Sequence, residues 1–172
     1  AKMVPIVEPE VLMDGNHAID KCYEVTSKVL IECFNELKIN NVNLKGIVLK
    51  PNMILPGTNY KQKASTEEIA SKTLDCLKKT MPKEVPGVAF LSGGQSEIEA
   101  TKNLNAINKI NDTNFNFTFS YGRALQQSAL KTWAKSMKDV KNIQKVFDHR
   151  AKMNGASTEA KWEEKNEQNF AA

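Results

Sequence analysis

The stretch Gly87–Thr101 reads GVAFLSGGQSEIEAT, and it joins an apolar run to the beginning of a helix. Its first six residues, Gly87–Ser92, are nearly all small or apolar, as expected of a strand that is buried on both faces of a parallel sheet. Ser96 and Glu99 then form a capping box, in which the two side chains bond free backbone amides at a helix start. The stretch therefore predicts a strand, a glycine turn and a helix from about Glu97 to Ile107.

The same order of strand and helix recurs along the chain. The other strand-like runs are Met3–Pro9, Gly46–Lys50 and the alternating run Phe115–Tyr121, and the helical patterns that follow them are His17–Leu37, Thr66–Lys79 and Ala124–Met137. Two further helices are predicted near Asn142–Met153 and Thr158–Glu167, and we expect the last twenty residues to form a loosely held tail. Four strand–helix repeats predict an α/β protein with a parallel sheet and right-handed crossovers.

Two architectures fit this order of elements. One is an open doubly wound sheet, and the other is half of an eight-stranded (β/α) barrel. A complete barrel of this kind typically has about 250 residues, whereas the chain has 172 residues and strands for half of one. The residues at the strand ends have to decide between these alternatives.

Composition limits the function classes. The chain is 41% hydrophobic with a net charge of +4, which favours one soluble domain and suits an anionic small-molecule substrate. No apolar run reaches the ~18 residues of a membrane helix, no signal-peptide pattern opens the chain, and the scattered lysines disfavour nucleic acid. Three cysteines without a CxxC pair favour a cytoplasmic protein with free thiols, and two distant histidines disfavour a metal site.

In both architectures ligands bind at the carboxyl ends of the strands. The first run ends Val7-Glu8-Pro9-Glu10, and alternation places the two carboxylates on one side of an extended strand. Two close carboxylates raise one pKa and can keep a proton available near neutral pH. Glu8 and Glu10 are therefore either a general acid/base pair or a solvated strand end.

The second run, GIVLKPN at Gly46–Asn52, ends in a lysine. Desolvation by Ile47, Val48 and Leu49 would lower the pKa of the Lys50 amine, and a neutral amine condenses with a carbonyl to form a Schiff base. The alternative is a lysine whose charged end reaches water or a carboxylate. A carboxylate pair on the preceding strand favours the nucleophile, because Schiff-base chemistry needs a nearby proton carrier.

The third and fourth runs end in phosphate-binding types of sequence. Ser92-Gly93-Gly94 precedes a capped helix, and glycines there allow backbone amides to approach a phosphate. Ser120-Tyr121-Gly122-Arg123 also precedes a helix, and an arginine can hold a phosphate with two hydrogen bonds. Barrel enzymes often build a phosphate site from the loops after strands seven and eight, which these loops would be in the second half of a barrel.

Several motifs in this order resemble one family. VPIVEPEVL, LKPNM, VPGVAFLSGGQSEIEAT, NLNAIN and SYGRALQQSAL together resemble class I fructose-1,6-bisphosphate aldolase of the eukaryotic glycolytic type. The resemblance extends from Met3 to about Met153 and covers the C-terminal half of such an enzyme. It implies an eight-stranded (β/α) TIM barrel, of which this chain supplies strands five to eight with their helices in residues 1–153, followed by a helical or flexible tail in residues 154–172.

The resemblance also implies the roles of single residues. Lys50 matches the Schiff-base lysine, Glu8 the carboxylate that moves protons, and Glu10 the neighbouring supporting carboxylate. The substrate phosphate site matches Ser92, Gly93, Ser120, Tyr121, Gly122 and Arg123. The protonated imine accepts electrons during cleavage of fructose 1,6-bisphosphate, so that no metal or other cofactor is needed and the zinc-dependent class is disfavoured. The family is usually a homotetramer.

Two departures from the family pattern are expected to matter. Strands one to four, with their aspartate, lysines and arginines, are missing, and we therefore expect a fragment or an incompletely represented subunit that is inactive alone, because half a barrel leaves open sheet edges. The family ends in a tyrosine on a mobile tail, whereas the last tyrosine here is Tyr121. A tail truncated within a flexible segment is the favoured explanation.

Two rival functions stay open. One is a non-catalytic scaffold that binds actin or acidic peptide tails through Lys135, Lys138 and Lys141, which fit a solvated helix face equally well. The other is a different Schiff-base barrel enzyme, such as a transaldolase or a deoxyribose-phosphate aldolase. That class is not expected to share the LSGG and SYGRA sequences, so the fructose-bisphosphate aldolase is the favoured function.

Overall fold

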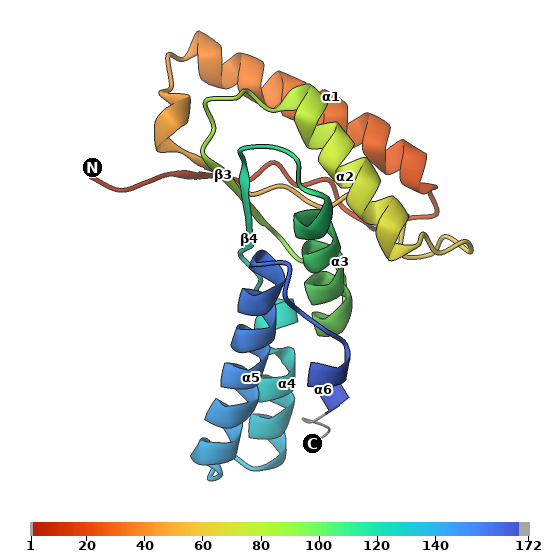
Figure 1. The fold of residues 1–172 in the computed structure, drawn as a ribbon, viewed down its shortest axis with the longest axis vertical. Helices are drawn as coiled ribbons and strands as arrows, with labels where there is room; N and C mark the ends of the chain where they lie inside the picture. Colours follow the sequence, from red (N-terminus) through yellow and green to blue (C-terminus); the bar gives the residue numbers. More distant parts are fainter. Residues whose placement is uncertain (1, 169–172) are drawn as a thin grey trace.

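The computed structural model describes residues 2–168 as one sheet with helices packed against it (Figure 1). The strands are β1 (Ile6–Val7), β2 (Val48–Leu49), β3 (Gly87–Phe90) and β4 (Asn116–Phe119), and the helices are α1 (Ile19–Ile39), α2 (Thr66–Thr80), α3 (Glu97–Ile110), α4 (Arg123–Lys135), α5 (Val140–Thr158) and α6 (Lys165–Gln168), with a 3₁₀ turn at Leu44–Gly46. The chain is thus an α/β protein, as the sequence predicts.

The four strands are parallel and lie in sequence order, β1-β2-β3-β4. A doubly wound sheet needs a point at which the strand order reverses, and no such point occurs among the described strands. An order that advances by one strand per crossover is that of a (β/α) barrel. The sheet therefore favours half a barrel over the doubly wound alternative.

The strands β1 and β2 are shorter than the predicted apolar runs because prolines interrupt the ladder on both. Pro5 and Pro9 flank β1 and Pro51 follows β2, and a proline has no N–H to donate. The parallel hydrogen bonds nevertheless extend beyond the strands, since Lys50 N donates to Val7 O at 2.7 Å and Leu91 N to Pro51 O at 3.1 Å. The strand ends are therefore fixed relative to one another.

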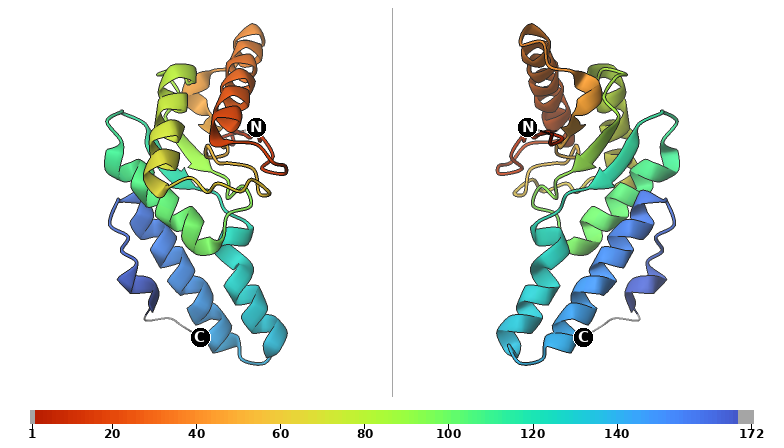
Figure 2. Two further views of the ribbon diagram at one scale, coloured as in Figure 1. Left: turned by 90° about the vertical axis from the view of Figure 1, so that its right-hand side faces the viewer. Right: turned by 90° about the vertical axis from the view of Figure 1, so that its left-hand side faces the viewer.

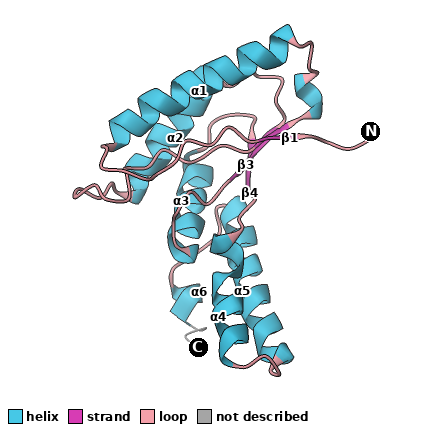
Figure 3. Ribbon diagram, turned by 180° about the vertical axis from the view of Figure 1, so that it is seen from behind, coloured by secondary structure: helices cyan, strands magenta, loops and turns pink. Residues whose placement is uncertain are grey.

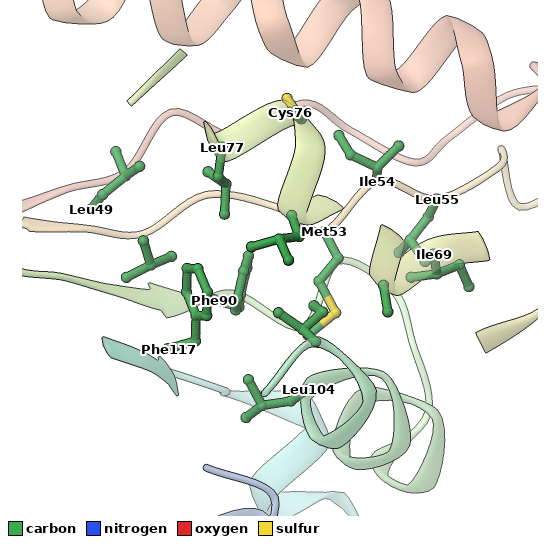
Figure 4. Close-up of a cluster of buried hydrophobic side chains, with 14 of the residues drawn as sticks. Leu49, Met53, Ile54, Leu55, Ile69, Cys76, Leu77, Phe90, Leu104 and Phe117 are labelled. Carbon is green, nitrogen blue, oxygen red and sulfur yellow. The ribbon is translucent and has the colours of Figure 1, made fainter. Parts of the chain in front are cut away.

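The register separates the residues of the sheet onto two faces. Val7, Leu49, Val88 and Phe117 lie side by side in neighbouring strands. The last three belong to one hydrophobic core, and the partly buried Val7 packs against it. Figure 4 shows Leu49, Phe90 and Phe117 with Leu77 of α2 and Leu104 of α3 in this core. Because side chains alternate along a strand, Glu8 and Lys50 start on the opposite face, which in a barrel is the interior.

The helices begin where the sequence predicts caps. The capping box at Ser96 and Glu99 is complete at the start of α3, and the Ser65 side chain accepts a hydrogen bond from Glu68 N at the start of α2. α1 and α2 lie side by side, and α3 follows next to α2 (Figures 1 and 2). None of the helices in residues 2–168 is long and apolar enough to cross a membrane.

The C-terminal helices differ from the prediction. α4 and α5 form a pair that extends away from the sheet (Figure 3). α5 continues through Gly155 to Thr158, because Asn154 and Ser157 are fully buried against the rest of the protein. The predicted helix over Thr158–Glu167 is wrong: the chain turns after α5, with Ala160 at φ 58°, and only Lys165–Gln168 is helical.

Residues after α5 pack back onto the body of the protein. Trp162 is 5% exposed, and its backbone N–H donates to Asn105 Oδ1 of α3 at 3.0 Å. Glu167 is ion-paired with Arg150 of α5 at 2.6 Å. These contacts hold the segment as far as α6. The proposed division at residue 153 stays a prediction, and the last four residues of the predicted tail, 169–172, lie outside the described part of the chain.

Candidate active site

Lys50 and Glu8 meet at the carboxyl ends of β2 and β1. Lys50 Nζ lies 2.9 Å from Glu8 Oε1, and the two side chains are 19% and 45% exposed. Each residue comes directly after the last residue of its strand, and the hydrogen bond from Lys50 N to Val7 O aligns the two ends. The structure thus brings together the amine and the carboxylate that the sequence suggests, on the face of the sheet opposite the helices.

This arrangement can move a proton between the two side chains. A lysine has to lose one proton before it can attack a carbonyl, and Glu8 is an acceptor within hydrogen-bonding distance. A partly exposed carboxylate can then pass the proton to another oxygen. Glu10 is exposed, and it lies two residues beyond Glu8 across Pro9. The predicted supporting role of Glu10 stays a prediction.

The loop after β3 contains two consecutive glycines in the left-handed backbone region. Gly93 and Gly94 have φ of +53° and +78°, a region that a residue with a Cβ rarely adopts. Ser92 precedes them and is half-buried, and its carbonyl accepts hydrogen bonds from Gln95 N and from the Gln95 side chain. The two glycines therefore shape this loop ahead of the first turn of α3.

The loop after β4 lies beside the loop after β3, because Ser120 N donates to Phe90 O at 2.9 Å. Gly122 is the N-cap residue of α4, and Arg123 is exposed in its first turn. Tyr121, in contrast to the exposed Arg123, is buried: it is 5% exposed, and its hydroxyl donates to Ala100 O of α3 at 3.0 Å. Burial raises the pKa of Tyr121 far above its ordinary value, so its hydroxyl serves the packing of the loop.

The chain is similar to known proteins over its whole length. The family model described as fructose-bisphosphate aldolase class-I matches residues 1–172. The chain belongs to this family. A probable class 1 fructose-bisphosphate aldolase of Xylella fastidiosa is 48% identical over 161 residues, which are 93% of this chain and 48% of that protein. The cytosolic fructose-bisphosphate aldolase 4 of Arabidopsis thaliana is 52% identical over 157 residues, 91% of this chain and 40% of the relative.

A solved structure of the family has the same fold. The fructose-bisphosphate aldolase of Plasmodium falciparum, in a ternary complex with TRAP and a small-molecule inhibitor, superposes with a TM-score of 0.91 at 46% identity. The match covers 94% of this chain and 47% of that one. The chain therefore spans about half the length of the aldolases that it matches, and its four strands form part of a TIM barrel.

The cysteines are poor candidates for a nucleophile. Burial raises the pKa of the thiols of Cys22, Cys33 and Cys76 above the ordinary value, and only a thiolate is a strong nucleophile. In residues 2–168 no group of three or more His, Cys, Asp or Glu side chains is placed to hold a metal ion.

Sequence reasoning overlooked one residue at this edge of the sheet. Asn52 is 2% exposed, and its side-chain oxygen accepts a hydrogen bond from Val11 N at 3.0 Å. No local sequence pattern indicates this residue, because its burial and its partner 41 positions away become visible only in the packed fold. A cavity of about 430 Å³ was also not predicted. It adjoins the β3–α3 loop at Gly93 and Gly94 and is otherwise lined by the two preceding loops, α2 and α3.

Proposed function

We propose that the protein to which this chain belongs is a class I aldolase that reversibly cleaves fructose 1,6-bisphosphate into dihydroxyacetone phosphate and glyceraldehyde 3-phosphate in glycolysis. The observation that carries the proposal is the 2.9 Å contact between Lys50 Nζ and Glu8 Oε1 at the carboxyl edge of the sheet. The names of the family relatives support the substrate.

The chemistry assigned to Lys50 begins with loss of a proton to Glu8. The free amine attacks the ketone carbon of the substrate, and Glu8 returns the proton to the departing hydroxyl as water leaves and the protonated imine forms. Glu8, again a carboxylate, then accepts the proton of the hydroxyl on the β-carbon, the second carbon from the imine carbon. The bond between the α- and β-carbons breaks, the β-carbon becomes the aldehyde of the departing product, and the electron pair of the broken bond passes to the imine to form an enamine. This electron sink is part of the covalent intermediate, and neither a metal nor another cofactor is required for it.

The phosphate of the ketone half is assigned to the two loops beside the lysine. Both loops lead into the amino end of a helix, which suits them to an anion. Backbone amides near Ser92 and Gly93 precede α3, and Gly122 is the first residue before α4. Arg123 is exposed and can reach a phosphate with two hydrogen bonds. Ser120 and Tyr121 contribute through the position of their backbone, since the Tyr121 hydroxyl is bonded to Ala100.

The remaining properties concern the whole protein. The chain matches about half of the length of its relatives. We assign the other half of the barrel, with the second phosphate site, to sequence outside this chain. A cytoplasmic location is proposed by analogy with the Arabidopsis relative, which is named as cytosolic. A homotetramer is the assembly that the family resemblance suggests.

Borohydride trapping tests the proposal. The full-length protein is incubated with dihydroxyacetone phosphate, reduced with sodium borohydride and digested. Mass spectrometry of the peptides then locates the reduced adduct. The expected product carries the reduced adduct on Lys50. Failure to trap any adduct in a protein that is folded, or an adduct confined to other lysines, would overturn the assignment.

A second function concerns the end of the molecule formed by α4 and α5. Lys135, Lys138 and Lys141 are exposed there, and Trp133 and Met137 are 49% and 65% exposed beside them. We propose that this surface binds actin filaments or acidic peptide tails. Filament cosedimentation should fall steeply with salt and be unchanged in Lys50→Met. Binding that is insensitive to salt, or unaffected when all three lysines are replaced by glutamine, would exclude it.

A further inference from the structure

The segment that carries the two glutamates is fixed at both ends to the segment that carries Lys50. Lys50 N donates to Val7 O at 2.7 Å, directly before Glu8. The next cross-connection is Val11 N to Asn52 Oδ1 at 3.0 Å, directly after Glu10. Two hydrogen bonds therefore enclose residues 8–10 of the first segment and Pro51 of the second. The Lys50–Val7 bond joins two backbone groups, whereas the Val11–Asn52 bond depends on a side chain.

Prolines explain why a side chain is needed at this point. Pro9 and Pro51 occupy the middle of the two segments, and neither can donate a hydrogen bond to extend the backbone ladder. Val11 N would lack a strand partner where the ladder ends. The Asn52 carboxamide supplies the acceptor, and it extends the connection between the two strand ends beyond the point at which the backbone stops pairing.

Asn52 is itself held in one orientation. Its Nδ2 group donates to Thr26 Oγ1 of α1 at 3.0 Å and to Met53 O at 3.1 Å. Because Met53 O can only accept, the nitrogen has to face it, and the oxygen has to face Val11. The side chain is 2% exposed, and its two N–H groups and its oxygen all have partners. A buried amide with every group paired is a rigid support.

We infer that Asn52 is a positioning residue that holds Glu8 within proton-transfer distance of Lys50. This inference rests on the proposed function. Glu8 touches Lys50 and, among the described residues, has no second hydrogen-bond or ion-pair partner to fix it. Its distance from the amine is therefore set by the backbone of residues 8–10, and the Asn52–Val11 bond fixes the far end of that backbone. A displacement of about 1 Å between reacting groups can reduce a rate ~10²-fold.

The test compares Asn52→Ala with Asn105→Ala in the full-length protein. Asn105 is a matched control, because it is also buried and its side-chain oxygen also accepts one backbone N–H bond, from Trp162 at 3.0 Å. It lies on α3, where it bonds the C-terminal segment rather than the ends of β1 and β2. Both variants should lose thermal stability. Asn52→Ala should in addition lower kcat and the rate of borohydride trapping by ~10- to 100-fold, with a much smaller change in KM, while Asn105→Ala should retain both rates.

The outcomes separate the inference from the function on which it rests. If wild type is not trapped on Lys50, the proposed function fails. If wild type is trapped and Asn52→Ala is trapped at the wild-type rate, the positioning role is wrong and the function stands. Should Asn52→Ala fail to fold, Thr26→Val removes the acceptor of Nδ2 while keeping the amide. It should lower kcat in the same direction by a smaller factor, and an unchanged kcat would overturn the inference.

Discussion

Two ion pairs of this chain each join a carboxylate to a cation, and their surroundings differ. Glu8 and Lys50 lie 2.9 Å apart with side chains 45% and 19% exposed. Glu167 and Arg150 lie 2.6 Å apart with side chains 9% and 7% exposed. Glu167 also accepts from Trp162 Nε1 at 2.8 Å and lies 3.4 Å from His149 Nε2. The first pair is open to a substrate, whereas the second is surrounded by protein.

The difference in exposure suits the two ion pairs to different roles. A carboxylate with several donors around it is stabilised as an anion and resists a change of protonation. A carboxylate with one partner and half of its surface in water can accept and release a proton. The C-terminal pair therefore fastens α6 to α5, and the strand-end pair is available for proton transfer.

The largest expected effect comes from removing each cation. Lys50→Met should lower kcat by at least ~10³-fold because no other nucleophile replaces the amine, while the unfolding free energy changes by less than about 1 kcal/mol because the pair is partly exposed. Steady-state kinetics and urea unfolding of the full-length protein measure the two quantities. Substantial residual turnover in Lys50→Met would mean that another residue forms the imine.

Arg150→Met is the matched variant for the buried pair. It leaves the Glu167 carboxylate buried without its main partner, which should lower the unfolding free energy by about 3–5 kcal/mol. Turnover of the fraction that remains folded should stay near wild type, since Arg150 bonds Thr101 and Glu167 and none of the residues assigned to the site. The comparison would break if Arg150→Met proved as stable as wild type.

The next effect depends on pH. Burial alone would raise the pKa of Glu167, but the hydrogen bonds from Arg150 and Trp162 outweigh it and hold that pKa below its ordinary value. A lowered carboxyl pKa stabilises the folded protein above the unfolded value of about 4.3, and this contribution disappears as the pH falls through the lower folded value. Because Glu167→Gln leaves the buried Arg150 guanidinium without its carboxylate partner, it should be less stable than wild type by ~3 kcal/mol at pH 7.

Urea unfolding of wild type and Glu167→Gln between pH 7 and pH 3 checks this sign. The gap between the two proteins should be constant near neutrality and should shrink below about pH 5, as the unfolded wild-type chain begins to take up a proton. A gap that widened as the pH fell would contradict the pairing of Glu167 with Arg150.

A smaller effect distinguishes glycines in the two regions. A Cβ on Gly57 would clash with Gly15 O, and Gly57 N donates to His17 O where the loops after β1 and β2 meet. Gly57→Ala should therefore separate these loops and lower the unfolding free energy by ~1–3 kcal/mol, with a fall in kcat. Thermal unfolding and kinetics measure both, and an alanine accommodated without loss of stability would show that the loops are not closely fitted.

The smallest effect is expected at Gly155 in the middle of α5. A Cβ there meets nothing within 4 Å, and alanine loses less backbone entropy than glycine on folding into a helix. Gly155→Ala should raise the unfolding free energy by about 0.5–1 kcal/mol. A destabilised variant would indicate that the C-terminal region is packed more tightly around α5 than the structure shows.

Prediction from sequence succeeded where the information is local. The apolar runs, the serine caps and the glycine turns predict the strands, helix starts and loops, because each depends on a few neighbouring residues. The general rule that ligands bind at the carboxyl ends of parallel strands drew attention to Glu8 and Lys50. The family resemblance is confirmed by the match to residues 1–172.

Prediction failed where distant residues decide the structure. The helix predicted near Asn142–Met153 ends too early, because buried Asn154 and Ser157 keep α5 helical to Thr158. Asn154 Oδ1 accepts a hydrogen bond from Thr101 of α3. The Asn52–Val11 bond spans 41 positions and the Arg150–Glu167 pair spans 17. Such contacts depend on the packed fold, and no local pattern of residue types indicates them.

The rate of imine trapping in two glutamine variants tests the contrast between the ion pairs most directly. Glu8→Gln and Glu167→Gln each remove one negative charge from a carboxylate paired with a cation. With dihydroxyacetone phosphate and borohydride, Glu8→Gln should form the reduced Lys50 adduct ~10²- to 10⁴-fold more slowly than wild type, while folded Glu167→Gln should form it at the wild-type rate. Equal rates in the two variants would contradict the assignment of Glu8 as the proton carrier.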